Sequence, residues 1–347
     1  MRLVAPLLAW LLGWSISTGQ EPVSFHGKTV TLIVGSAPGG GTDAFGRLVA
    51  SFLANYLPGK PNIIVRNLPG ADGMTSMNYI AQQVAADGYT IAAQANNMVN
   101  PIQYRRSQAR FDPVKFGIFG GAGRGGELLL ISNEAEKRLH DKKARPVIMG
   151  SLGGVPRSGM QMVAWAIDRL DWNVKWVTGY RATNDLMLAL ERGEIDMTST
   201  GNNFQVQSFI QSGKFKPLLQ SGALKNGVLV PRHEFGDAPV LATVLHGRLD
   251  SPLLANAFEY WSAIAAMDKW LSLPPQSPAE MLGVYRNAYH KVMQDPEYLE
   301  RGRRISDEFF PMSSAEVETL IVKLASLPRE ATEYMSFMMQ KQGLSSQ

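Results

Sequence analysis

A strand followed by a glycine-rich loop and an amphipathic helix occurs near the start of the chain and again in its middle, and this repeat constrains the fold most. The first unit opens with the apolar, β-branched run 29–34, which is typical of a parallel strand covered on both faces. Three consecutive glycines lie in the loop 35–43, and the apolar residues from Phe45 to Tyr56 recur at helical spacing. A βα unit is therefore predicted here.

Each of these units continues as a βαβαβ array, which predicts parallel strands joined by right-handed crossovers. Two such arrays predict two doubly wound α/β domains. The expected strands are 29–34, 62–65, 89–93, 146–149, 174–177 and 195–198, and the expected helices are 45–56, 77–84, 160–167 and 186–190. The glycine-rich segment 117–126 is predicted to be a crossover or hinge. The tail is predicted to form helices over 278–293 and 314–324, without a strand of its own.

Composition narrows the function classes. The chain has 347 residues, enough for two domains, and 45% of them are hydrophobic, enough for a core in each. A net charge of +4 is not typical of a nucleic-acid binder. The absence of cysteine excludes disulfides, cysteine zinc sites, iron–sulfur clusters and a thiol nucleophile, and five scattered histidines argue against a histidine-rich metal site. We therefore expect no cofactor, no metal and no nucleic-acid partner.

The N-terminus has the pattern of a secretory signal peptide. Arg2 precedes the apolar run from Leu3 to Ile16, and small polar residues separate that run from Glu21. Because the run is short for a membrane span, which needs about 20 apolar residues, we expect residues 1–20 to be a cleaved signal. A retained membrane anchor is the alternative.

Three loops are placed to bind a ligand, because ligands of open α/β sheets lie beyond the carboxyl ends of the strands, near helix N-termini. In the first loop, Gly39, Gly40 and Gly41 precede a helix that Thr42 or Asp43 is expected to cap, so bare N–H groups can approach an anion. The spacing fits neither a P-loop nor a dinucleotide-binding loop. A tight turn without a ligand is the alternative.

The second and third loops follow strands of the second array. The second, 151–158, contains Arg157, and the third, 180–185, contains Arg181, which could bind a carboxylate through two hydrogen bonds. The alternative places both arginines in solvent and makes Asp185 a plain helix cap. The strand ends at Asn96 and Asn202 carry further polar side chains, for which a turn is the alternative.

Catalytic motifs are missing from the sequence. It contains no Gly-x-Ser-x-Gly, no His-Glu-x-x-His and no carboxylate pair at a telling spacing. Asp43 could be proposed as a general base, but its position after the glycines favours a helix cap. The sequence therefore gives little support for catalysis, and no enzyme activity is predicted.

Three motifs in order resemble those of the solute-binding proteins of tripartite tricarboxylate transporters, the Bug family. That family shows P-G-G-x-x-D after its first strand, N-x-P-G-A-x-G after its second and P-D-G-Y-T before its third. They correspond to Pro38–Asp43, Asn67–Gly73 and 86–90, the last with Ala86 in place of proline. The resemblance extends through 150–158, 180–196, 273–278 and 294–297, and so covers essentially the whole chain after the signal.

The resemblance implies a periplasmic monomer with a Venus-flytrap fold, the type II periplasmic-binding-protein fold with two crossovers. Domain 1 would comprise residues 27–120 plus 269–347, and domain 2 residues 121–268. The cleft would capture a small organic carboxylate and deliver it to the membrane subunits of a tripartite tricarboxylate-type transporter. A periplasmic sensor for signalling, or a cell-envelope enzyme that uses the same cleft, is the alternative.

Residue by residue, Gly39, Gly40 and Asp43 match the family's first loop, and Tyr180 with Arg181 matches its Tyr-Lys/Arg pair. The sequence departs at Ala182 and Thr183, where relatives commonly have two glycines, and a side chain there could fill space or donate a hydroxyl. It departs again over 250–269, where an additional helix of unassigned role is expected. The candidate ligand-binding residues are Pro38, Gly39, Gly40, Gly41, Thr42, Asp43, Asn96, Ser151, Gly153, Gly154, Arg157, Ser158, Tyr180, Arg181, Ala182, Thr183, Asn184, Asp185 and Asn202.

Overall fold

The computed structural model describes residues 23–123, 125–154, 156, 158–225, 228–305 and 309–344. The predicted signal peptide over 1–20 and the candidate Arg157 lie outside the described residues. Within those residues, none of the helices has both the length and the apolar character needed to cross a bilayer.

The first sheet has six strands, and both ends of the chain contribute to it. Its order is β13-β4-β12-β3-β1-β2, with β1 parallel to β2 and to β3 as predicted, whereas β12 and β13 run antiparallel to their neighbours. The sheet is therefore mixed. Its strands are β1 (Thr29–Val34), β2 (Asn62–Asn67), β3 (Thr90–Ala95), β4 (Gly117–Gly123), β12 (Lys269–Leu273) and β13 (Phe310–Ser313).

The second sheet has five strands in the order β7-β6-β8-β5-β9. The predicted strands β6, β7 and β8 are parallel, and β5 and β9 add antiparallel partners that the periodicity did not predict. A two-stranded sheet, β10 (Ala223–Lys225) with β11 (Val228–Val230), follows. The five strands are β5 (Leu128–Ser132), β6 (Val147–Ser151), β7 (Val174–Thr178), β8 (Met197–Thr200) and β9 (Phe215–Gln220).

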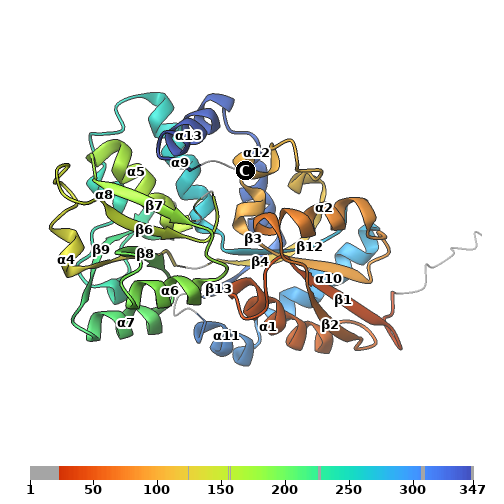
Figure 1. Cartoon of the computed structure of the whole chain (residues 1–347). Helices are drawn as coiled ribbons and strands as arrows, with labels where there is room; N and C mark the ends of the chain where they lie inside the picture. Colours follow the sequence, from red (N-terminus) through yellow and green to blue (C-terminus); the bar gives the residue numbers. More distant parts are fainter. Residues whose placement is uncertain are drawn as a thin grey trace, which may run out of the picture.

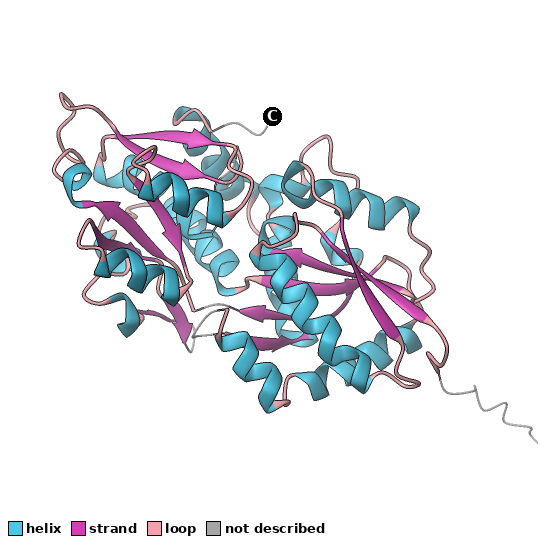
Figure 2. Ribbon diagram, turned by 60° about the horizontal axis from the view of Figure 1, so that its bottom comes forward, coloured by secondary structure: helices cyan, strands magenta, loops and turns pink. Residues whose placement is uncertain are grey.

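Helices flank each sheet, and Figures 1 and 2 show two halves of the molecule side by side. We call the first sheet with α1, α2, α10 and α11 the first lobe, and the second sheet with α4 to α8 the second lobe. In the first lobe the helices are α1 (Gly41–Tyr56), α2 (Met74–Gln83), α10 (Ala279–Val292) and α11 (Pro296–Arg303). In the second lobe they are α4 (Asn133–Glu136), α5 (Gln161–Leu170), α6 (Thr183–Glu191), α7 (Asn203–Gln211) and α8 (Leu241–Val244). The two-domain α/β fold is confirmed.

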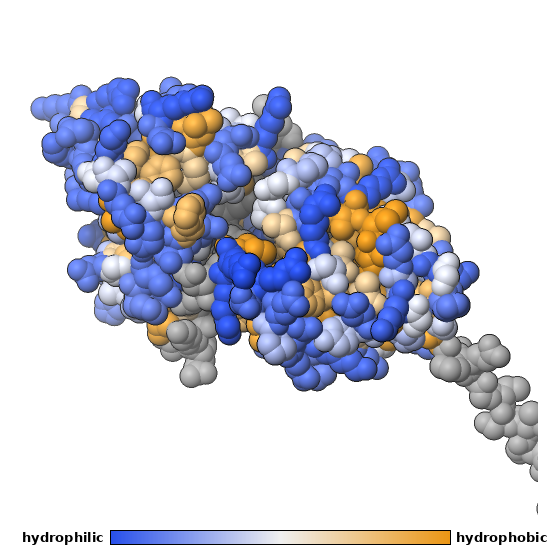
Figure 3. Space-filling model, turned by 90° about the horizontal axis from the view of Figure 1, so that it is seen from below, coloured by the Kyte–Doolittle hydropathy of each residue, from blue (hydrophilic) through white to orange (hydrophobic). Residues whose placement is uncertain are grey.

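Successive side chains of β1 point to opposite faces of the first sheet, as in any strand. Val30, Leu32 and Val34 join a core cluster with residues of α1 and α10, including the buried ring of Tyr289. Ile33 points the other way, into a cluster that continues into the second lobe. The outer surface seen in Figure 3 is mainly hydrophilic, with separate hydrophobic patches. The lobes therefore share apolar packing on one side of the first sheet.

Two sequence predictions for the chain between and after the lobes were wrong, one of them in part. The glycine-rich segment 117–126 was expected to be a crossover or hinge; its end does lead from the first sheet to β5 in the second, but most of it, Gly117–Gly123, forms the buried strand β4 between β12 and β13. Its glycines permit close packing, because a Cβ on Gly120 would lie 2.1 Å from the Tyr289 ring and one on Gly121 would lie 2.5 Å from the Lys269 carbonyl oxygen. The tail was expected to lack a strand, but β13 lies at the edge of the first sheet.

Three C-terminal helices complete the fold beside the lobes: α9 (Pro252–Ala266), α12 (Ser314–Ala325) and α13 (Arg329–Lys341). The additional helix expected over 250–269 is confirmed as α9. It contacts the short 3-10 turns Asn96–Val99 and Ser158–Met160, one from each lobe, as well as α12 and α13. Figure 1 shows α9 and α13 between the lobes. This helix thus contacts both lobes.

The last helix also connects distant parts of the chain. The hydroxyl of Tyr334 donates to Asp168 at 2.5 Å, and Trp176 donates its ring N–H to Gln342 at 3.2 Å. α13 also contacts the short helix α3 (Pro101–Tyr104). The division into domain 1 (27–120 plus 269–347) and domain 2 (121–268) remains a prediction. Helix α13 belongs to domain 1 in that division, and it packs on α5 of the second lobe.

Candidate functional site

The first predicted loop is organised around the buried carboxylate of Asp43, which is 3% exposed. Its Oδ2 accepts the N–H of Gly39 at 2.9 Å and pairs with Arg47 Nε at 3.0 Å, and its Oδ1 accepts from Asn67 Nδ2 at 2.8 Å. Burial alone would raise the pKa of Asp43, but the hydrogen bonds from Arg47, Gly39 and Asn67 outweigh it and hold the pKa below its usual range. Asp43 therefore stabilises the conformation of the loop before α1.

The helix after this loop begins earlier than predicted. Its N-cap is Gly40, whereas Thr42 or Asp43 was expected, and no side chain caps it. The N–H of Gly39 binds Asp43, and that of Gly40 reaches the Ala37 carbonyl at 3.4 Å. The first N–H groups of a helix have no intrahelical acceptor and carry the positive end of its dipole, so Gly41 and Thr42 are the residues here that can attract an anion. Pro38 is exposed.

A cavity of about 100 Å³ lies where the two lobes meet, at the start of α1. Four of the predicted residues, Gly41, Thr42, Asn96 and Thr183, line it. The full lining is Gly41, Thr42, Ala95, Asn96, Glu127, Leu152, Met160, Thr183, Ser199, Thr200, Gly201, Asp268 and Lys269. Because most of these residues lie at or just after the carboxyl ends of β3, β6 and β8 or begin α1 and α6, the cavity lies at the strand ends where ligands of α/β sheets bind.

Several charged and hydroxyl side chains of this lining were not predicted. Ser199 donates its hydroxyl to Glu127 Oε2 at 2.8 Å, and Lys269, which is 7% exposed, pairs with the neighbouring Asp268. Thr200 Oγ1 donates to Gln205 Oε1 at 2.7 Å. The run of small polar residues 198–200 at a predicted strand end could have indicated Ser199 and Thr200 as lining residues. Glu127, Asp268 and Lys269 lie before or at the start of a strand, where no sequence pattern indicated a site.

The loop after β6 meets the first lobe. The hydroxyl of Ser151 donates to the Gly153 carbonyl at 3.1 Å. A Cβ built on Gly153 would lie only 2.4 Å from Oδ2 of Asp72, a residue of the loop after β2 with φ of 59°. The two loops are thus in contact across the boundary between the lobes. Gly154 follows in the same loop, and Ser158 begins the 3-10 turn that leads into α5.

The third loop contributes less than expected. Tyr180 is partly buried, and burial, with Glu194 nearby, raises the pKa of its phenol. Arg181, Asn184 and Asp185 are exposed and are not among the residues that line the cavity.

Two capping assignments follow from the same region. Helix α6 has Ala182 as its N-cap, so the alternative that made Asp185 the cap is wrong. Asn202 caps α7 by accepting the Gln205 N–H at 3.0 Å and donates to the Ile305 carbonyl at 3.2 Å. These hydrogen bonds give Asn202 a structural role.

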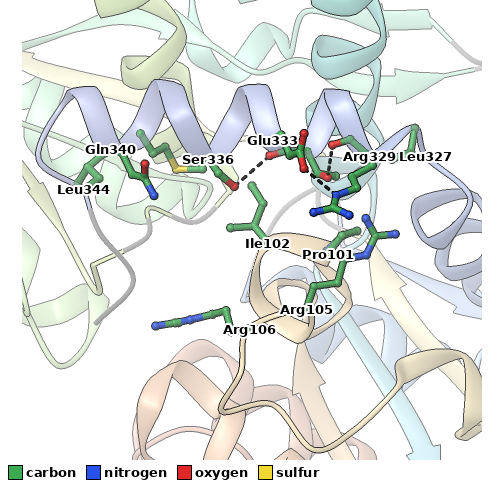
Figure 4. A pocket seen from close by; sticks show the side chains of 12 residues that line it. Pro101, Ile102, Arg105, Arg106, Leu327, Arg329, Glu333, Ser336, Gln340 and Leu344 are labelled. Carbon is green, nitrogen blue, oxygen red and sulfur yellow. Dashed lines mark hydrogen bonds and ion pairs between the residues drawn. The ribbon is translucent and has the colours of Figure 1, made fainter.

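A larger hollow of about 670 Å³ lies elsewhere, between α3 and α13 (Figure 4). Its arginines bind protein groups: Arg329 pairs with Glu333 at 2.6 Å, and Arg105 donates to the Ala325 carbonyl at 3.1 Å. This groove is not at the carboxyl ends of the parallel strands. The smaller cavity between the lobes is therefore the better candidate site. Among the described residues, no group of three or more His, Asp and Glu could hold a metal ion.

Comparisons with known proteins agree with the fold and with the loop motifs. No protein-family model matches the chain. A UPF0065 protein of Bordetella pertussis is 26% identical over 288 residues, which cover 80% of each chain. The structure of the periplasmic binding protein BugD superposes with a TM-score of 0.65 at 16% identity over 91% of this chain and 98% of that one.

A Rhodopseudomonas palustris protein with adipate superposes with a TM-score of 0.64 at 17% identity, over 90% of this chain and 97% of that one. Neighbours at such identities show the fold, and the curated relative supplies the sequence relationship. The resemblance read from the three loop motifs is confirmed: this chain is a UPF0065 (Bug-family) homologue with the two-domain α/β fold of periplasmic binding proteins.

Proposed function

We propose that the protein is a periplasmic solute-binding protein that holds a small organic carboxylate in the cavity between its lobes and delivers it to a tripartite tricarboxylate-type membrane transporter. The observation that carries this proposal is the lining of the cavity. The N-terminus of α1 at Gly41 and Thr42 forms one wall, and hydroxyls from the second lobe form the other. A similar fold has been solved with adipate.

Each wall would contribute a different interaction. The free N–H groups and dipole of α1 favour a carboxylate at Gly41 and Thr42. Thr183 on the second lobe adds a hydroxyl that can donate to one of the ligand's other oxygens. Because the two walls belong to different lobes, a ligand that contacts both stabilises the closed arrangement. Binding without chemical conversion is sufficient for this role.

A negative charge added at the start of α1 tests this proposal most directly. We expect Gly41→Asp to weaken binding of a carboxylate at least about tenfold, since two negative charges would meet in the cavity. Folding should not suffer, because an acidic residue in the first turn of a helix is stabilising. Isothermal titration with a panel of carboxylates and their neutral amides measures the effect.

The matched control is Ser314→Asp, which places the same charge at the first position of α12, away from the lining residues. It should leave affinity unchanged. Equal affinities for wild type and Gly41→Asp would exclude the α1 N-terminus as the carboxylate site. A panel in which no acid binds the wild type would contradict the proposed function itself.

Delivery to a transporter is tested separately from binding. Spheroplasts of a strain that lacks this protein should take up the labelled acid only when purified protein is added. Binding that never stimulates uptake would favour the sensor alternative, and conversion of the acid would favour an enzyme.

A further inference from the structure

We propose that the groove between α3 and α13 is a docking surface for an acidic, amphipathic protein segment, and that docking favours the arrangement of the lobes seen in this structure. This inference rests on the proposed function for the source of the segment, which would be a membrane subunit of the transporter. The groove is distinct from the cavity between the lobes, since none of the described residues lines both. Docking is thereby assigned to a surface that carboxylate binding does not use.

One wall of the groove is attached to the first lobe. The chain after α3 is hydrogen-bonded to α2, where Asn78 donates to the Gln108 carbonyl at 2.9 Å and accepts the Arg110 N–H at 2.7 Å. Gln82, also on α2, donates to the Arg110 carbonyl at 2.8 Å. These hydrogen bonds hold the loop after α3 against α2, so α3 moves with the first lobe.

The opposite wall, α13, is attached to the second lobe. Gln342, the C-cap of α13, donates to the Ala164 carbonyl of α5 at 2.9 Å. Arg169 of α5 donates to the Tyr334 hydroxyl of α13 at 2.7 Å. Residues 326–328 join α13 to α12, which packs on β4 of the first sheet. Because the two walls are held mainly by different lobes, the width of the groove depends on how the lobes are arranged.

The lining of the groove combines basic and apolar side chains. Among its described residues are three arginines and one glutamate, so the formal charge is positive. Arg329 pairs with that glutamate, Glu333, whereas Arg105 donates to an uncharged group, the Ala325 carbonyl, at 3.1 Å. Apolar side chains complete the lining: Pro101, Ile102, Leu327, Met339 and Leu344. A segment that carries carboxylates beside apolar side chains complements this surface.

The shape of the surface favours a protein segment over a lipid bilayer. Figure 4 shows the side chains of α13 on one side of the groove and those of Ile102 and Arg106 on the other. A planar membrane surface cannot enter between two walls, whereas apolar side chains of a helix or an extended segment can. The partner is therefore expected to insert apolar residues into the groove and to place carboxylates near the exposed Arg105.

Docking and carboxylate binding should be coupled, because both depend on the arrangement of the lobes. Coupling between two binding sites is reciprocal. We expect a bound carboxylate to raise the affinity of the protein for transporter-containing membranes by at least about fivefold. The same membranes should raise the affinity of the protein for the carboxylate by the same factor.

Opposite charge changes at Gln340 test the chemistry of the groove. This residue lines the groove, is exposed and lies in the last turn of α13. The protein concentration that gives half-maximal uptake by spheroplasts should rise about threefold for Gln340→Glu and fall about threefold for Gln340→Lys, because the partner is acidic. Isothermal titration of the carboxylate without membranes should give the wild-type affinity for both variants.

The matched control is Gln211, which is also exposed and lies in the last turn of α7, away from the groove. Glutamate and lysine at this position should leave the half-maximal concentration unchanged. Because exposed charges are screened by salt, about 0.5 M salt should reduce the difference between the two Gln340 variants. Thermal melting of each variant establishes that it is folded.

The outcomes separate this inference from the proposed function. If both Gln340 variants reach half-maximal uptake at the wild-type concentration, the groove is not the docking surface and the proposed function stands. Equal changes at Gln211 would assign the effect to net charge and also overturn the inference. If the wild type never stimulates uptake, the transporter is not the partner, and delivery and docking both fail.

Two further measurements identify the wrong occupant. Binding to protein-free phosphatidylglycerol vesicles that weakens in Gln340→Glu and strengthens in Gln340→Lys would make an anionic lipid the occupant. A monomer–dimer equilibrium in the analytical ultracentrifuge that shifts with the same variants would make it a second copy of this chain. Either result would overturn the inference of a transporter segment, and neither is expected.

Discussion

Asp43 illustrates how one buried carboxylate organises the loop before a helix. It accepts the Gly39 N–H, an Asn67 amide proton and the Arg47 guanidinium, so its oxygens are used by the protein. These bonds shape the turn that presents Gly41 and Thr42 to the cavity. The two glycines before the helix thus serve the geometry of the loop, while the residues after them face the cavity.

Asp43→Asn should lower stability in a pH-dependent way. The pKa of Asp43 is depressed in the folded state, so the ionised form stabilises the fold above the unfolded pKa of about 3.9. That stabilisation is lost as the pH falls through the folded pKa. We expect Asp43→Asn to reduce the free energy of unfolding by about 1–3 kcal/mol at pH 7, and by progressively less below about pH 4.

Urea unfolding of both proteins from pH 7 to pH 3 measures this difference. Asp185→Asn is the matched control, since Asp185 is also in the first turn of a helix but is exposed. A deficit for Asp43→Asn that stays constant over the whole pH range would show that the ionised carboxylate is not the source.

At the scale of elements, α9 joins the second lobe by aromatic packing and the first lobe by a hydrogen bond. Phe258 lies 5.3 Å from the Trp165 ring of α5 and 5.1 Å from Trp261 of α9 itself, measured between ring centroids. At the other end of the helix, Asn96 donates its side-chain amide to the Ile264 carbonyl at 3.0 Å. The helix therefore holds the second lobe through aromatic rings and the first through the segment that follows β3.

Phe258→Ala should be strongly destabilising. Removal of a buried phenylalanine typically costs about 3–5 kcal/mol, because a cavity is left between rings that cannot close up. Denaturant unfolding followed by tryptophan fluorescence measures the loss. Phe204→Ala is the matched control, since Phe204 is 82% exposed and its removal should change stability by no more than about 0.5 kcal/mol. Similar losses for both variants would exclude this packing role.

At the scale of the whole molecule, the contact between Gly153 and Asp72 governs how closely the lobes approach. Both loops follow parallel strands, β6 in one lobe and β2 in the other. A Cβ at position 153 would lie 2.4 Å from the Asp72 carboxylate, so either that side chain or the two lobes would have to shift. We expect the lobes to shift, which makes Gly153 a residue that permits close approach.

Gly153→Ala should therefore hold the lobes apart. We expect a larger radius of gyration by small-angle X-ray scattering and weaker ligand binding than in the wild type. Gly283→Ala on α10, where a Cβ would meet nothing within 4 Å, should show neither change. Adding Asp72→Gly to Gly153→Ala removes the opposing carboxylate, and this double variant should regain the wild-type dimensions. Wild-type scattering from Gly153→Ala would contradict this closing contact.

How much the sequence could predict differs between elements and the site. The strands and helices of both βαβαβ arrays follow from periodicity, because one or two faces of each element are buried wherever the array folds. Strand β13 and the strand character of Gly117–Gly123 could not be read this way. Their place depends on partners far away in the chain, with Gly121 beside Trp270 and Met312.

The sequence by itself determined the two α/β arrays, the family resemblance and the loop that starts α1, because these depend on residues close together in the chain. Only the tertiary structure decided which side chains face the cavity. Glu127 and Ser199 meet because β5 pairs with β8, and Lys269 joins them because β12 returns to the first sheet beside β3. Strand order is set by packing over the whole molecule, so no local pattern could reveal those neighbours.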